Sequence, residues 1–134
     1  QCVHLYPKSE SGKPSVCLKT MSGVPNQTDL RREAYGVHWD KAEFDGWSEG
    51  KAGFLGYSAK IAHGKGTSVV KQDGDREGYA VYVTVPGKKN VLVLGSWPLQ
   101  YPNSKQTFLD IVRGVGTCTF KPQKGCVADR PYDG

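Results

Sequence analysis

Long apolar runs are absent from this sequence: no stretch of about 18 apolar residues occurs anywhere in the 134-residue chain. We therefore expect no membrane-spanning helix. Methionine is also scarce, with one in the chain, and the sequence begins with Gln1 rather than with a methionine. These features predict a secreted, extracellular protein from which a signal peptide has been removed.

Clusters of one charge are missing as well. The chain carries 18 Lys and Arg against 13 Asp and Glu, a net charge of +5, but its only adjacent basic pairs are Arg31-Arg32 and Lys88-Lys89. A basic protein attracts polyanions at long range. Without a basic stripe, however, nucleic acid is not the expected partner. The length and a hydrophobic fraction of 37% predict a single domain over residues 1–134.

Cysteine is limited to four residues, one pair near each end of the chain: Cys2, Cys17, Cys118 and Cys126. Closely spaced cysteine pairs of the kind that bind zinc are absent, so neither a metal nor another cofactor is expected. An even number of cysteines in a small secreted chain predicts two disulfides. Two arrangements remain open: Cys2 bonds to Cys17 across a hairpin, or the bonds tie the two chain ends together.

Apolar patterning predicts a sheet with a central hairpin. Residues 79–85 are predicted to form a strand whose side chains alternate between two faces, and residues 90–97 form a nearly continuous apolar strand after a turn at 86–89. Both faces of the second strand should therefore be covered. Further strands are expected at 2–6, 15–21 and 117–120, and composition predicts a turn at 72–78. A turn centred between Ser9 and Glu10 would place Cys2 opposite Cys17. Residues 37–57 show no clear period.

Two segments have helical signals. Residues 28–35 follow the capping residue Asn26 and precede Gly36, which can end a helix. A capping box is expected over residues 103–106, followed by the helical apolar face of Phe108, Leu109 and Val112. Together these elements predict an α+β fold: a small sandwich with a largely antiparallel sheet and about two helices, stabilised by two disulfides.

Aromatic and acidic residues are concentrated between residues 38 and 57 and again between 97 and 103. Sugars offer apolar faces that stack on aromatic rings and hydroxyls that need directional acceptors. The sequence therefore predicts a lectin-like protein that binds glycans or glycoproteins on cell surfaces, and it favours binding over catalysis without deciding whether the protein is an enzyme. The expected ligand-binding residues are Asp45, Trp47, Tyr57, Trp97 and Tyr101. Asn26-Gln27-Thr28 is a glycosylation sequon in a secreted protein.

Two other functions are compatible with the sequence. A toxin-like effector would act on a foreign cell through a protein or membrane partner, using its basic surface for first contact. A small secreted ribonuclease would need an acid and a base, together with cations that stabilise the phosphate. Its residue types are present in His4, His38, His63, Glu33 and the Arg31-Arg32 pair. The sequence does not establish whether they come together.

Overall fold

The computed structural model describes residues 2–5 and 14–116 as seven strands, two α-helices and a short 3-10 turn. The strands are β1 (Val3–Leu5), β2 (Ser15–Met21), β3 (Trp39–Phe44), β4 (Ser48–Ala52), β5 (Tyr57–Ser68), β6 (Asp75–Val83) and β7 (Asn90–Pro98). The helices are α1 (Gln27–Tyr35) and α2 (Asn103–Arg113), and the turn η1 is Lys71–Asp73. Cys118, Cys126 and the predicted strand at 117–120 lie outside the described residues.

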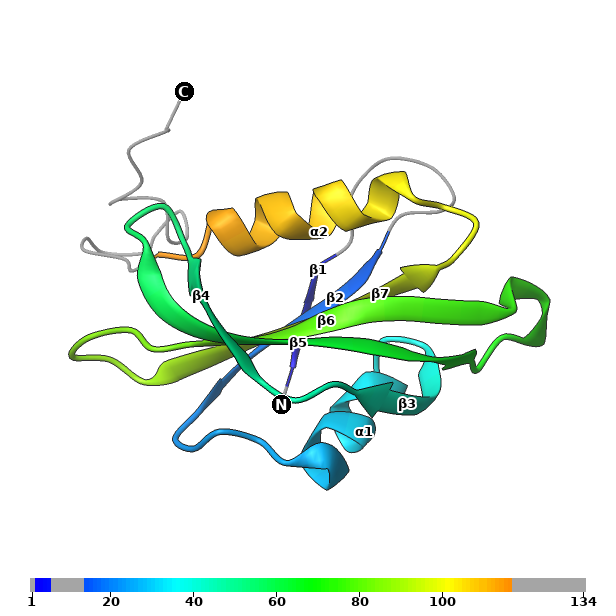
Figure 1. Cartoon of the computed structure of the whole chain (residues 1–134), viewed down its shortest axis with the longest axis horizontal. Coiled ribbons are helices and arrows are strands. Elements are labelled where there is room, and N and C mark those ends of the chain that lie inside the picture. Colours follow the sequence, from blue (N-terminus) through cyan, green and yellow to red (C-terminus); the bar gives the residue numbers. More distant parts are fainter. Residues whose placement is uncertain (1, 6–13, 117–134) are drawn as a thin grey trace.

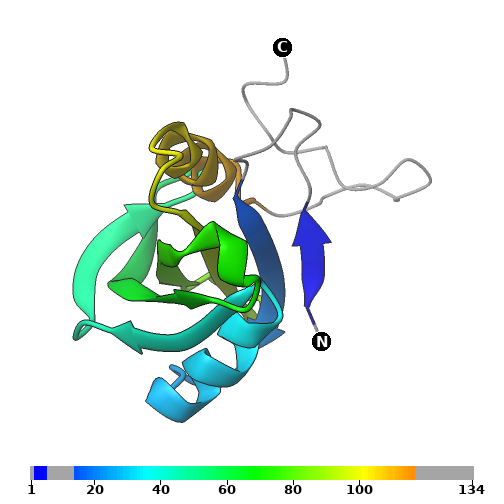
Figure 2. The same cartoon turned by 90° about the vertical axis from the view of Figure 1, so that its right-hand side faces the viewer.

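The strands form one antiparallel sheet in the order β1-β2-β7-β6-β5-β3, with β4 also paired to β5. The two helices lie on opposite faces of this sheet (Figure 1). Seen from the side, the sheet is strongly curved (Figure 2). The α+β class, the antiparallel sheet and the two helices are thus confirmed, as is the central position of the β6–β7 hairpin.

Each helix covers its own hydrophobic core. The core on the α2 side includes Val81, Val83 and Val93 from the sheet and Phe108 from α2. The core on the α1 side includes Ala80, Leu92 and Leu94, together with Leu30 from α1. Alternation along β6 and β7 sends neighbouring side chains to opposite faces, so a nearly continuous apolar strand needs a layer on each side.

The start of α1 follows its sequence signals closely. Asn26 is the N-cap: its Oδ1 accepts a hydrogen bond from Asp29 N at 2.9 Å, and Asp29 Oδ2 accepts one from Asn26 N at 3.3 Å. This reciprocal pair is a capping box. The predicted capping box of the second helix is wrong, because the N-cap position is occupied by Pro102 and no side chain caps it. Gln106 instead donates to Asp110 within the helix at 2.9 Å.

The register of the first hairpin is shifted by two residues from the register expected for a turn centred between Ser9 and Glu10. His4, rather than Cys2, pairs with Cys17. Cys2 lies two residues before His4, on the same face, and its Cα is 5.3 Å from that of Cys17. This distance suits a disulfide, so of the two arrangements left open the cross-hairpin pair is the one found.

Two segments of the chain differ from the sequence prediction. β6 begins at Asp75, so the predicted turn at 72–78 is wrong in its second half. The segment without a clear period contains β3 and β4, which pair with the two halves of the long strand β5. The register of β3 shifts between Asp40 and Glu43, and Lys41 has a φ of 49°. This bulge breaks the alternation by which a strand is identified.

Candidate functional site

The strands β5 and β6 extend past the N-terminus of α2 (Figure 1). Polar residues are concentrated at this end of the two strands. Three directly paired positions carry them: His63 with Tyr79, Lys65 with Glu77, and Thr67 with Asp75. Earlier positions of the same alternation, Ile61 and Val81, contribute to the core on the α2 side. Because side chains two residues apart share a face, all six lie on the α2 side of the sheet. We call these six residues the polar array.

Within the polar array, His63 has a carboxylate near each of its two ring nitrogens. Its Nε2 lies 3.2 Å from Glu77 Oε1, and its Nδ1 lies 3.8 Å from Asp45 Oδ2. The Asp45 backbone N–H donates to the His63 carbonyl at 2.8 Å, which fixes the two residues together. The side chains of His63 and Glu77 are 30% and 27% exposed, so a ligand can reach them.

Aromatic rings connect the His63 end of the polar array to α2. The Tyr79 ring contacts the His63 ring edge-on, with 5.2 Å between the ring centres. It also stacks against the Phe108 ring of α2, with 6.1 Å between the ring centres. Lys105, also on α2, places its Nζ 5.9 Å from the centre of the Tyr79 ring. The helix therefore brings a cation close to the Tyr79 ring, which in turn contacts His63.

A shallow groove of about 370 Å³ adjoins the polar array. It is lined by Glu43, Lys65, Gly66, Thr67, Asp75, Arg76 and Leu99. Arg31 binds both oxygens of Glu43, at 2.7 and 2.8 Å, and so offsets its charge. Leu99 is half exposed and gives the groove one apolar wall. The groove thus combines donors, acceptors and an apolar surface.

Arg76 anchors the strand beneath the groove. Its side chain is buried, and its Nε and Nη2 donate to the Oγ and carbonyl oxygen of Ser96 at 3.0 and 2.9 Å. Ser96 Oγ in turn donates to the carbonyl of Val37 at 2.7 Å. Burial lowers the pKa of the Arg76 guanidinium, and the nearby Asp73 carboxylate partly opposes that shift. These bonds hold β6, β7 and the end of α1 in fixed relative positions.

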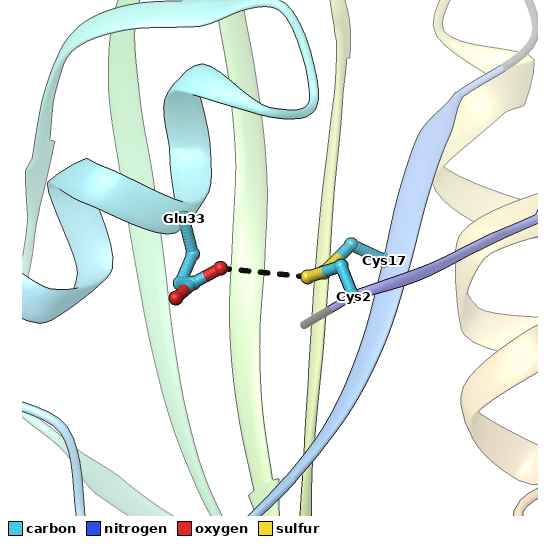
Figure 3. Close-up of side chains that lie close together, drawn as sticks. All are labelled: Cys2, Cys17 and Glu33. Atoms are coloured by element: carbon cyan, nitrogen blue, oxygen red, sulfur yellow. Dashed lines mark hydrogen bonds between the residues drawn. A yellow bond between two sulfur atoms is a disulfide. The ribbon is translucent and has the colours of Figure 1, made fainter.

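A separate cluster lies near the chain's start, where Cys2 and Cys17 face Glu33 of α1 (Figure 3). Glu33 Oε1 is 3.5 Å from Cys2 Sγ, and Glu33 also forms an ion pair with Lys19. Among the described residues these three are the set with ligand atoms close enough for a metal. Because the two sulfurs are joined, they offer no thiolates, and the cluster is structural.

The residues predicted to bind a glycan do not form one site. Asp45 lies beside His63, and Tyr101 is 36% exposed just after β7. Trp47 is half-buried against the α1-side core, whereas Tyr57 packs against the α2-side core at the far end of β5. Trp97 is fully buried between Tyr79 and Phe108, so its ring is not available for stacking on a sugar.

The histidines considered for a ribonuclease are also in different places. His4 lies on β1, His38 lies between α1 and β3 with its Nδ1 3.2 Å from Ser15 Oγ, and His63 lies on β5. Glu33 forms ion pairs with Lys19 and Arg32 instead of contacting His63. Of these candidates, only His63 belongs to the polar array.

Sequence reasoning missed most of the polar array, namely Lys65, Thr67, Asp75, Glu77 and Tyr79. A signal was present: polar residues recur at every second position in 63–67 and again in 75–79. Glycines at 64, 66, 74 and 78 lie between or beside them and gave the segments the composition of turns.

No known protein family matches this chain. The search of curated proteins likewise found no match. Neither helix in the described part of the chain is long and apolar enough to cross a membrane.

Proposed function

We propose that this protein is a secreted carbohydrate-binding protein whose ligand lies along the polar array and in the adjoining groove. The observation that carries the proposal is the set of three paired polar positions at the end of β5 and β6, where the side chains of His63 and Glu77 are partly exposed beside α2. Expected partners are glycans or glycoproteins on cell surfaces. This site differs from the set of residues first expected, and of those it retains Asp45, which contacts His63.

The chemistry of the groove suits a sugar. Asp75 accepts hydrogen bonds from hydroxyl groups and Lys65 donates. Thr67 Oγ1 donates its proton to the Asp40 carbonyl at 3.2 Å and can accept from the ligand. Asp45, beside His63, is a further acceptor. Leu99 offers an apolar surface to the C–H face of a sugar ring. Small-ligand sites combine an apolar surface with a few well-placed polar groups in this way.

Acidic sugars are the preferred ligand class. The chain has a net charge of +5, which raises the local concentration of anions. Lys65 and Lys105 place two ammonium groups at the polar array, and each can pair with a carboxylate of the ligand. Neutral sugars would use the same hydroxyl acceptors without this charge contribution.

Titration calorimetry with acidic and neutral oligosaccharides tests the proposal. Lys65→Ala removes a charge-assisted hydrogen bond of about 1.5–3 kcal/mol, so we expect affinity for an acidic ligand to fall by about 10- to 100-fold. Lys88→Ala, in the exposed turn between β6 and β7, is the matched control and should bind normally. Equal affinity in both variants, or no binding to any oligosaccharide, would refute the proposal.

Secretion carries two further expectations. We propose a second disulfide between Cys118 and Cys126, and a glycan on Asn26. Asn26 is exposed, and its Oδ1 makes the cap while a glycan would attach at Nδ2. The two roles are therefore compatible. Mass spectrometry of unreduced peptides from the protein secreted by a eukaryotic host should find both features, and reactive thiols would contradict the first.

A further inference from the structure

We propose that the polar array also cleaves its ligand, by β-elimination of a 4-linked polyuronic acid with His63 as the base. This inference rests on the proposed carbohydrate binding. Elimination needs a base, a proton donor and a cation that neutralises the uronate carboxylate. The polar array holds one group suited to each task.

His63 is held as a base by Glu77. The contact of 3.2 Å between His63 Nε2 and Glu77 Oε1 allows the ring to donate its proton there. In that tautomer Nδ1 is the acceptor. Asp45 Oδ2, 3.8 Å from Nδ1, belongs to an exposed side chain and stabilises the imidazolium once it forms. Glu77 acts through His63 and is a positioning residue.

Tyr79 is the neighbouring proton donor. It pairs directly across from His63, and the two rings lie 5.2 Å apart. The Lys105 ammonium lies 5.9 Å from the centre of the Tyr79 ring, within the range of a cation–π contact.

Lys65 is the cation for the substrate. It lies two residues from His63 on the same face of β5, and in the strand register it stands opposite Glu77. An ammonium group that neutralises the uronate carboxylate makes the proton on the adjacent carbon, C5, more acidic. This is stabilisation of charge that develops in the transition state.

The step is balanced without a co-reactant. His63 Nδ1 removes the proton from C5, and the electron pair of that C–H bond forms a C4–C5 double bond. The bond from C4 to the bridging oxygen breaks, and this oxygen takes the proton of the Tyr79 hydroxyl. Proton transfer through solvent from the imidazolium to the phenolate restores both side chains.

The arrangement favours elimination over RNA cleavage. In-line attack at phosphorus places the attacking and leaving oxygens on opposite sides of the phosphate. His63 and Tyr79 are instead neighbours on one sheet face. They therefore suit a reaction in which one proton is removed from C5, and another is delivered to the leaving oxygen, on the same side of the sugar.

The test uses the full oxidised chain with polymannuronate, in which the C5 hydrogen and the C4 oxygen lie on the same side of the ring. Polygalacturonate, in which they lie on opposite sides, should not be cleaved. Elimination creates an unsaturated sugar that absorbs in the ultraviolet, and its products together have the mass of the substrate. His63→Gln should lower the rate by about 100-fold or more, whereas the affinity measured by calorimetry stays within a few-fold. Tyr79→Phe should lower the rate similarly. His38→Gln, which changes a histidine outside the polar array, should have no effect.

The possible outcomes separate the two proposals. Binding of uronate without unsaturated product overturns the elimination and leaves carbohydrate binding intact. Neither binding nor product overturns both. Products heavier by one water indicate hydrolysis and refute the elimination. Cleavage of RNA that depends on His63, without action on uronates, would overturn the inference in favour of a ribonuclease. Circular dichroism of each variant confirms that a lost rate is not lost folding.

Discussion

Replacing Phe108 with alanine is expected to lower the free energy of unfolding by about 3–5 kcal/mol, the usual cost of removing a buried phenylalanine ring. Phe108 is the fully buried anchor of α2. It contacts the rings of Tyr79 and Trp97, and it lies directly over Gly95, where any side chain would overlap the ring. The cavity left by alanine cannot be filled from the glycine side. Urea denaturation followed by circular dichroism measures the loss.

Leu109→Ala is the control for this prediction. Leu109 is the next residue of α2 and is only partly buried, so its truncation should cost clearly less than that of Phe108. Equal losses would mean that α2 is not anchored through Phe108. Ligand affinity should also fall in Phe108→Ala, because the Tyr79 ring loses the partner against which it stacks.

Trp39→Ala is the second large effect, again about 3–5 kcal/mol of unfolding free energy. Trp39 is fully buried on the other face of the sheet and contacts Phe44 edge-on at 5.2 Å. Its ring occupies the space above Gly64 and Gly66, where a Cβ would lie within 2.8 Å of it. Those glycines provide the space that the indole fills, so no neighbouring side chain can replace it.

Trp39→Phe should cost less than Trp39→Ala for two reasons. The phenyl ring keeps much of the buried volume. It also removes the indole Nε1, which is buried without a hydrogen-bond partner in the described structure, and an unsatisfied buried donor is itself unfavourable. Denaturation of both variants tests this order. A phenylalanine variant as unstable as the alanine variant would show that the indole NH contributes stability.

The parts of the fold predicted from sequence are those with strong local patterns. The β6–β7 hairpin has alternating and continuous apolar segments around a Pro-Gly turn, and α1 has a cap, an acidic first turn and a terminal glycine. Each of these signals acts over a few residues. These local signals also predicted the α+β class and the need for a layer on each face of β7.

The rest depended on contacts between distant segments. β3 and β4 have little apolar alternation of their own and are held as strands by pairing with β5. The buried bonds of Arg76 join residues 37, 76 and 96, and nothing at position 76 distinguishes this arginine from a solvated one. Trp97 looked like a binding residue because a loop follows it, yet packing of α2 buries it completely.

The candidate site shows the same limit. Asp45 was predicted from local composition, but its partner His63 comes from another segment, and Glu77, which contacts the other nitrogen of His63, comes from a third. Their proximity follows from the register of β5 and β6, in which His63 pairs with Tyr79 and Lys65 with Glu77. Register is set by the whole sheet and its cores, so only the folded structure brings the six residues together.

Amide chemical shifts measured by NMR during titration with an oligouronate test the central claim most directly. Binding at the polar array predicts that the largest changes occur at residues 63–67 and 75–79, with smaller ones around Asp45 and Leu99. The same titration of Lys65→Ala should need a higher ligand concentration to reach these changes. Shifts concentrated at Trp47 and Tyr57, or a spectrum that does not respond to the ligand, would contradict the account.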